Sequence, residues 1–185
     1  MVRPIVIYGD PVLRAKCVKV EEVTPEIREL AADMIETMIE ARGVGLAAPQ
    51  VGEAIQLAVI DVSHDPECIS YLRVNGKDTD MKEIMPLIFI NPQLELITPK
   101  ETEEEGCLSF PDIRAMITRP EQVKATLMTL NGEMLVIETD GLFSRAIQHE
   151  TDHLHGRLFL DRMPSATKVS LKRKIKRMMA EYGHG

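Results

Sequence analysis

The chain has 185 residues, a length within the range of a single domain that buries a substantial core. Its 44% hydrophobic and 28% charged residues are the balance of an ordinary soluble protein, and no apolar run near the N-terminus indicates a signal peptide or membrane span. A formal net charge of -7 and the lack of Trp disfavour a membrane-surface protein or a direct, sequence-specific nucleic-acid binder.

The first predicted element is a helix between residues 24 and 43. Thr24 is suited to the N-cap and Pro25 to the first helical position, and apolar residues then recur at helical spacing. Gly43 is the expected stop. We expect Met34 and Met38 to face the core.

A loop is predicted at residues 43–52, GVGLAAPQVG, because Gly and Ala dominate it. The run 55–61, IQLAVID, is typical of a strand. Residues 62–86 are polar and indicate a long loop or hairpin excursion. We expect two short strands in 87–97, LIFINPQLELI, broken at Asn91-Pro92.

The acidic run 100–106, KETEEEG, is expected to be a solvated edge that leads into the turn CLSFPD. A hairpin is predicted from the β-rich runs 122–130 and 133–139, which flank Asn131-Gly132.

Two helices complete the chain, one from about Asp140 to Gly156 and an amphipathic one at about 165–182 with a basic outer face. The fold class predicted for residues 1–185 is a single α+β domain. Antiparallel β-sheets would pack around the central helix, with further helices near each end of the chain.

The central helix carries the sequence AIQHETDHLHG, which contains His149-Glu150-x-x-His153. Residues four apart lie about 40° apart around a helix, so His149 and His153 share one face. Glu150 projects close beside them. Two imidazoles and a carboxylate so arranged are typical of a metal-assisted hydrolase, in which the metal acidifies water and the carboxylate moves its proton.

A catalytic site of this kind needs a third ligand. His184 and Glu181 are the downstream candidates, and both lie near the end of the chain. Cys107 is the better candidate because Gly106 precedes it in a tight turn and lets the backbone approach a ligand. We expect Cys17 to be a core thiol and Cys68 a loop thiol, since no such turn surrounds them. Three widely spaced cysteines form no disulfide framework and suit a reducing cytoplasm.

The chain resembles the peptide deformylases in three separated motifs. The first is Gly43-Val44-Gly45-Leu46-Ala47-Ala48-Pro49-Gln50, the second is Glu105-Gly106-Cys107-Leu108-Ser109, and the third is Gln148-His149-Glu150-Thr151-Asp152-His153. The motifs occur in the family's order and span most of the chain, so together they are highly specific.

This resemblance implies one divalent metal held by Cys107, His149 and His153. Family members generally use Fe(II), with nickel or cobalt as substitutes, whereas the ligand set itself suits zinc. The resemblance further implies that Glu150 is the general base. It implies that the Gln50 amide and the Leu108 backbone N–H stabilise the oxyanion.

The substrate implied is the formyl-methionyl end of a new polypeptide, with formate as a product. It would lie extended along Gly43, Val44 and Gly45 and near Gly106. The methionine pocket is predicted from position alone. Its expected lining residues are Val44, Leu108, Phe110, Arg145 through its stem, Ala146 and His149.

Two features concern the surroundings of this site. Glu105 is expected to form an ion pair with Arg114 or Arg119 that braces the Cys107 turn, or else to remain an unpaired surface charge. Asp152 is expected either to orient a ligand or to pair with an Arg. The basic C-terminal helix of bacterial members docks on the ribosome, so the resemblance implies a ribosome contact here.

Two other classes of function compete with deformylation. Another metal-dependent amidase or peptidase shares the His-Glu-x-x-His helix, but its usual downstream third ligand is missing. A non-catalytic metal- and peptide-binding relative is disfavoured by the intact Glu150, because a pure binding site does not need that carboxylate.

Overall fold

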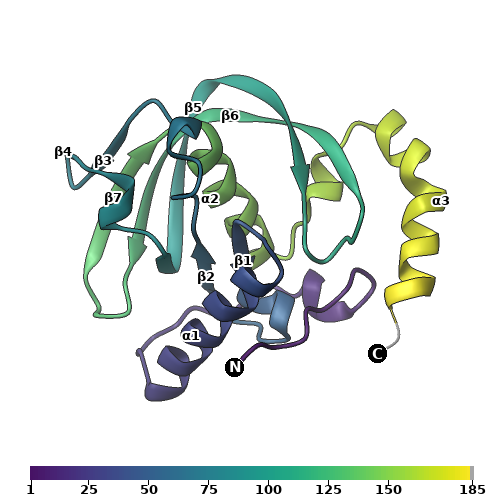
Figure 1. Cartoon of the computed structure of the whole chain (residues 1–185), viewed down its shortest axis with the longest axis horizontal. Coiled ribbons are helices and arrows are strands. Elements are labelled where there is room, and N and C mark those ends of the chain that lie inside the picture. Colours follow the sequence, from purple (N-terminus) through teal and green to yellow (C-terminus); the bar gives the residue numbers. More distant parts are fainter. Residues whose placement is uncertain (184–185) are drawn as a thin grey trace.

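The computed structural model describes residues 1–183 and places one helix at the centre of a strongly bent antiparallel sheet (Figure 1). The strand order is β1-β2-β5-β6-β7-β3-β4. The strands are β1 (Gly45–Ala47), β2 (Leu57–Ile60), β3 (Leu72–Val74), β4 (Lys77–Asp78), β5 (Leu87–Gly106), β6 (Arg114–Met128) and β7 (Met134–Thr139). The helices are α1 (Pro25–Glu40), α2 (Gly141–Leu154) and α3 (Ser165–Tyr182).

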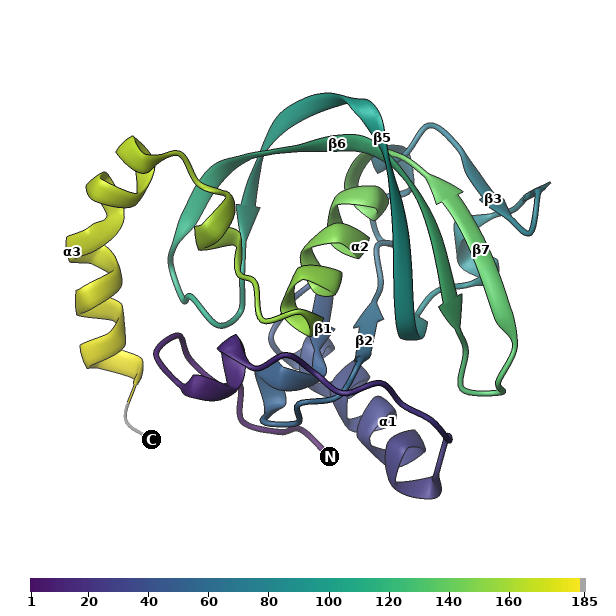
Figure 2. The ribbon, with the colours of Figure 1, turned by 180° about the vertical axis from the view of Figure 1, so that it is seen from behind.

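The two longest strands, β5 and β6, form a ribbon that passes over one end of α2 and descends on its other side (Figures 1 and 2). The register of this ribbon shifts between Ile97 and Lys100. Irregular pairing of this kind bends a ribbon and increases its twist. One half of the ribbon therefore continues the main sheet, while the other half forms a separate arm that carries Glu105 and Gly106 to α2.

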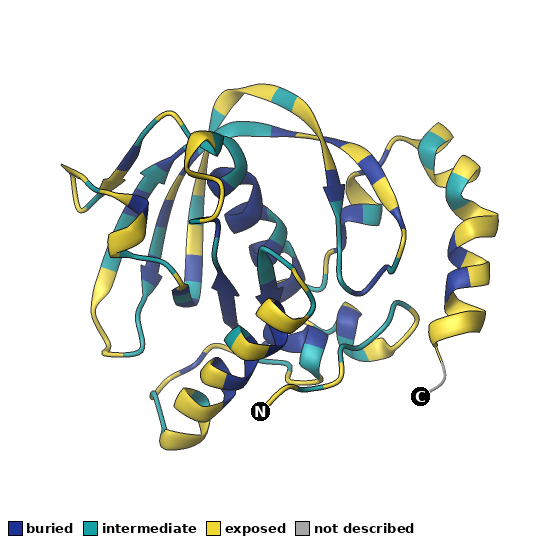
Figure 3. Ribbon diagram, in the orientation of Figure 1, coloured by how far each residue is buried: buried dark blue, intermediate teal, exposed yellow. Residues whose placement is uncertain are grey.

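Apolar side chains fix α2 between the two halves of the sheet. Phe143, Ile147 and Leu154 are fully buried, and α2 is largely buried along its length (Figure 3). The central placement of this helix among antiparallel strands confirms the predicted fold class.

The other two helices cover opposite sides of the molecule. The Thr24 hydroxyl accepts a hydrogen bond from the backbone N–H of Ile27 at 3.3 Å, as expected of an N-cap, and Met34 and Met38 are buried as predicted. α3 has the predicted bounds and buries only Ile175 and Met178, so most of its surface is exposed (Figure 3).

Three of the local predictions were wrong in detail. Residues 87–97 do not form two strands, because the ladder with β6 resumes at Gln93 after a bulge that leaves Asn91 and Pro92 unpaired. The acidic run 100–106 is part of β5, and one of its side chains, Glu105, points inward and is buried. α1 ends at Glu40 and not at Gly43.

The two segments predicted as loops also contain regular structure. Residues 43–52 hold β1 and a 3-10 helix, Ala48–Val51. The excursion at 62–86 holds the short β3–β4 hairpin, and β3 pairs with β7 at the far edge of the sheet. Asn75 and Gly76 both have positive φ at its turn, which explains their suitability there.

Cys17 is buried in the core, as predicted, and Cys68 lies half-buried in the 3-10 helix Pro66–Cys68 rather than in an open loop. His184 lies outside the described residues. Over residues 1–183, none of the helices is long and apolar enough to cross a membrane.

Gly156 and Gly132 provide a matched test of how α2 is anchored. Both have positive φ, at 73° and 80°, but a Cβ on Gly156 would lie 2.5 Å from the Arg14 carbonyl oxygen, whereas one on Gly132 would meet open space. We expect Gly132→Ala to lower the free energy of unfolding by about 1–2 kcal/mol for its backbone conformation alone. Gly156→Ala should lower the free energy of unfolding by at least about 1 kcal/mol more than Gly132→Ala does, as measured by urea unfolding. Equal losses would contradict this close packing.

Candidate metal centre

Two segments bring the candidate ligands together. His149 and His153 project from α2, and Cys107 follows the end of β5 in a tight turn closed by a hydrogen bond from the Phe110 N–H to the Cys107 carbonyl. One potential ligand atom from each of Cys107, His149 and His153 lies within 4.8 Å of the other two. The cysteine predicted as third ligand is therefore the one that the fold places beside the histidine pair.

The spacing of these atoms suits one small divalent ion. Cys107 Sγ lies 3.5 Å from His153 Nε2. Ligands about 2.0–2.3 Å from a tetrahedral metal are separated by roughly this distance. A thiolate with two imidazoles leaves one coordination position open, which is the arrangement of catalytic rather than closed structural sites.

Glu105 holds the imidazole of His149 in a fixed orientation. One carboxylate oxygen lies 2.8 Å from His149 Nδ1, so the other ring nitrogen, Nε2, is left to face Cys107 and His153. Such an outer carboxylate fixes the tautomer and makes the imidazole a better ligand. Arg119 donates two hydrogen bonds to the same carboxylate, at 2.6 and 3.0 Å.

Arg145 completes this buried group. It donates to Glu105 at 2.6 Å and to the backbone carbonyls of Ile117 and Glu101 at 2.9 and 3.1 Å. Glu105, Arg119 and Arg145 are all buried. Burial alone would raise the pKa of Glu105, but the hydrogen bonds from His149 and Arg119 outweigh it and hold the pKa far below its usual range.

The ion pair predicted for Glu105 thus forms with Arg119 and not with Arg114. Arg114 pairs instead with the exposed Glu104 at 2.7 Å, because alternate residues of β5 point to opposite faces of the ribbon. Asp152 pairs with Arg119 at 2.9 Å and with Arg162 at 2.8 Å. Asp152 was predicted either to orient a ligand or to pair with an arginine, and the structure shows the arginine pairs. Through Arg119, Asp152 also joins the hydrogen-bonded group around Glu105.

Glu150 lies buried beside the ligands, and its Oε2 has no hydrogen-bond partner within residues 1–183. Burial raises the pKa of Glu150 to about 7, and the neighbouring His149 opposes that shift. Gly45 of β1 lies directly against this carboxylate, since a Cβ on Gly45 would come within 2.9 Å of Cδ and Oε2 of Glu150. A carboxylate with this pKa is suited to accept and return protons near neutral pH.

The pKa values of the two histidines are shifted in opposite directions. Burial would lower the pKa of His149, but hydrogen bonds with Cys107 and Glu105 raise it well above the ordinary value. Burial and the positive charge of His149 lower the pKa of His153 well below that value. A histidine must release its proton to ligate, so metal binding is coupled to proton release at His149.

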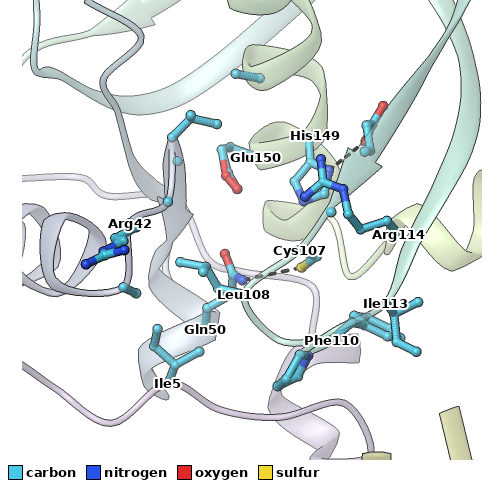
Figure 4. A pocket seen from close by; sticks show the side chains of 18 of the residues that line it. Ile5, Arg42, Gln50, Cys107, Leu108, Phe110, Ile113, Arg114, His149 and Glu150 are labelled. Carbon is cyan, nitrogen blue, oxygen red and sulfur yellow. Dashed lines mark hydrogen bonds and ion pairs between the residues drawn. The ribbon is translucent and has the colours of Figure 1, made fainter. Parts of the chain in front are cut away.

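Gln50 is fixed at both ends of its buried side-chain amide. Its oxygen accepts from the Ala47 N–H at 3.0 Å, and its nitrogen donates to Ser109 Oγ at 3.1 Å and to Cys107 Sγ at 3.6 Å. The residue therefore braces the loop and also presents an N–H at the ligand cluster (Figure 4). The Leu108 N–H makes no hydrogen bond to other backbone groups in the described part of the chain.

These groups open into a cavity of about 760 Å³. Its walls include every residue predicted to contact substrate: Gly43, Val44, Gly45, Gly106, Leu108, Phe110, Arg145 and Ala146. Further lining residues were missed by the sequence analysis, among them Ile5, Arg42, Ile113 and Leu142. Of these residues, only Leu142 could have been predicted from the sequence, because it lies on the same face of the helix as His149.

Comparison with known proteins agrees with this geometry. The family model for polypeptide deformylases matches residues 2–169. The chain is 42% identical to the peptide deformylase of Methylacidiphilum infernorum over 178 residues, which cover 96% of this chain and 93% of the relative. It is 43% identical to that of Acinetobacter baumannii over 180 residues, or 96% and 92%.

The chain belongs to the polypeptide deformylase family. Solved deformylase structures share its fold. That from Legionella pneumophila superposes with a TM-score of 0.82 at 30% identity, covering 100% of this chain and 99% of the other. A deformylase from Ehrlichia chaffeensis in complex with actinonin gives 0.81 at 33% identity over 95% and 96% of the two chains. The resemblance predicted from the three motifs is confirmed, and with it a metal-dependent hydrolase.

Glu105 and Glu104 allow the buried charge group to be tested with the same substitution at adjacent positions. Glu105→Gln removes the negative charge that the buried Arg119 and Arg145 share and leaves only Asp152 as a partner of Arg119, so we expect the free energy of unfolding to fall by about 3–5 kcal/mol. Glu104→Gln removes only the exposed pair with Arg114 and should cost less than about 1 kcal/mol. Urea unfolding measures both values, and a loss at position 105 as small as that at 104 would disprove the structural importance of the buried group.

Proposed function

We propose that this deformylase removes the formyl group from formyl-methionyl polypeptides through a centre built on Cys107, His149 and His153. The observation that carries the proposal is the convergence of these ligands beside a cavity lined by Cys107, His149 and the buried Glu150, whose Oε2 has no hydrogen-bond partner within residues 1–183. A single domain spanning residues 1–185 would contain all of this machinery.

The cofactor proposed is one divalent metal ion, with Fe(II) as the working metal and zinc, nickel or cobalt as alternatives. The 3.5 Å spacing of Cys107 Sγ and His153 Nε2 and the fixed orientation of His149 fit such an ion. When bound, the metal supplies Lewis acidity toward water and the formyl carbonyl. A thiolate ligand with Fe(II) would also make Cys107 sensitive to oxidation.

Glu150 is assigned the proton transfers. Its carboxylate takes a proton from the attacking water and later gives it to the amine that leaves the formyl carbon. A pKa of about 7 suits both directions of transfer at neutral pH. The negative charge that develops on the former carbonyl oxygen would be met by the Gln50 amide and the Leu108 N–H, and each such donor typically contributes about 3 kcal/mol to lowering the barrier.

The peptide is proposed to bind as an added strand. β1 lies at the edge of the sheet, so one side of its backbone is free to pair with an extended chain. Its residue Gly45 lies against Glu150, and a Cβ on nearby Gly43 would lie 2.7 Å from Leu108 Cδ1, so a side chain there would displace Leu108. Backbone pairing of this type accepts many sequences, as a nascent-chain enzyme requires.

The methionine side chain is assigned to the part of the cavity beside α2, between Val44, Leu108, Phe110 and Ala146. Arg145 contributes only its aliphatic stem, because its guanidinium is held by Glu105. Substrates of this kind are made in the cytoplasm, which is the compartment proposed for the chain.

α3 is proposed to contact the ribosome. It stands at the side of the molecule (Figure 2) and exposes its basic residues, which are Lys168, Lys172, Arg173, Lys174, Lys176 and Arg177. Positive side chains on an otherwise acidic protein are suited to bind RNA phosphates.

The assignment of Glu150 is tested by the formate released from formyl-Met-Ala-Ser, with protein purified anaerobically and loaded with Fe(II) or Ni(II). We expect Glu150→Gln to lower kcat/KM by about a hundred- to ten-thousandfold, the usual contribution of a general base. Its metal content should remain at one per chain. Normal turnover by this variant would refute the assignment.

Cys107→Ala is the matched variant in this assay, since it should lose the metal together with activity. Absence of formate from the wild-type protein with metal bound would refute deformylation itself.

The contact of α3 with ribosomes is tested by charge reversal. The variant Lys172→Glu/Arg173→Glu/Lys176→Glu changes three exposed residues and leaves the buried Ile175 and Met178 in place. We expect it to lose co-sedimentation with ribosomes and to retain wild-type formate release from free peptides. Unchanged co-sedimentation would show that α3 is not the contact.

A further inference from the structure

Arg42 stands where two cavities meet. It lines the main cavity and also a neighbouring one of about 310 Å³, whose other walls are Met38, Ile39, Gly43, Asp61, Ser63 and His64. Its side chain is exposed and points away from Glu150, on the opposite side of the site from Arg114 (Figure 4). The guanidinium makes no ion pair with any of residues 1–183, so its donors are free for a ligand.

The backbone conformation of Arg42 is one that glycine adopts more readily than arginine. Its φ is 57°, in the left-handed region, and it follows the end of α1. The Gly43 N–H bonds to the Met38 carbonyl at 2.9 Å and the Arg42 N–H to the Ile39 carbonyl at 3.0 Å. This is the helix-ending motif in which glycine is the usual residue at the left-handed position. The turn would accept glycine at this position, so the backbone alone does not account for an arginine side chain here.

The register of β1 indicates which part of a substrate Arg42 would meet. The reacting end lies beside Glu150, next to Gly45. An extended chain that leaves this point antiparallel to β1 advances about 3.3 Å per residue toward Gly43. Arg42 lies in the turn just beyond Gly43, at the end of β1 toward which the peptide runs, so the peptide would pass it at about its third residue.

The guanidinium of Arg42, which has no ion-pair partner within residues 1–183, favours an anionic side chain at that point. Arg114, on the other side, is already paired with Glu104 at 2.7 Å. In the neighbouring cavity, the Asp61 carboxylate, which carries a formal negative charge, accepts hydrogen bonds from the N–H and hydroxyl of Ser63 at 2.9 and 2.6 Å. That charge disfavours an acidic group on its side of Arg42, so the favoured position is on the main-cavity side.

We propose that Arg42 is a specificity-determining residue that selects formyl peptides with Asp or Glu as the third residue. This inference rests on the proposed deformylase function and narrows its substrate class. An exposed ion pair is weak and screened by salt, so the effect is a preference among substrates and not a requirement.

The test uses the metal-loaded, full-length protein and three C-terminally amidated peptides, formyl-Met-Ala-Glu, formyl-Met-Ala-Gln and formyl-Met-Ala-Lys. Amidation removes the terminal carboxylate, which would otherwise present the same charge in every peptide. We expect kcat/KM for Glu to exceed that for Lys by about three- to tenfold, mainly through KM, and the ratio to shrink at high salt.

Two variants of Arg42 and one control separate this role from a structural one. Arg42→Gly should unfold at or above the wild-type midpoint, because glycine suits the left-handed position, and yet lose the Glu-over-Lys preference. Arg42→Gln should lose it too. Arg157→Gln removes one positive charge from an exposed residue that lines neither cavity, so it should keep the preference.

Equal wild-type rates for all three peptides, or a preference that survives in both Arg42 variants, would overturn the inference. A preference found only at the second residue, with formyl-Met-Glu-Ala and formyl-Met-Lys-Ala amides, would overturn the register on which it stands. No formate from any peptide would instead refute the proposed function.

Discussion

The buried carboxylate of Glu105 is the interaction on which the site depends. It joins Arg119 from β6, Arg145 and His149 from α2, and its own strand β5 in one hydrogen-bonded group. A carboxylate buried without such partners would be neutral or would open the structure to water. With them it stays charged and holds the far arm of the ribbon against α2. Because Cys107 follows two residues later, the same group sets the position of the thiol relative to both histidines.

The bend in the ribbon gives this group its geometry. β5 begins in the main sheet beside β2 and ends against the opposite side of α2, so residues far apart in the sequence converge on one helical face. Asp152 extends the network outward to Arg162, at the start of the segment that leads to α3. Ligand orientation is thus coupled to the packing of the β-ribbon, of α2 and of the segment after it.

The sequence predicted which residues meet at the candidate metal centre, because the features that mark them are local. The spacing of His149 and His153 on one helix, the turn at Gly106-Cys107 and the N-cap of α1 are short-range features with direct physical signals. The continuity of β5 was missed because a proline normally ends a strand, and a bulge at Asn91 and Pro92 that accommodates it depends on the partner strand. The choice of Arg119 over Arg114 depends on strand register, and the place of Arg42 beside the cleft depends on the docking of α1, so neither could be read from the sequence.

The close packing of Gly45 against Glu150 limits how the protein could become resistant to a peptide-like inhibitor. A larger residue in β1 would block a peptide-like inhibitor that pairs with this strand. At Gly45, however, even a methyl group would collide with the carboxylate of Glu150. The strand edge proposed to bind the peptide and the carboxylate proposed to transfer the proton are thus packed against each other. A larger residue at Gly45 would therefore displace Glu150 and lower the activity. Substitutions that give resistance would have to lie further out along the cleft.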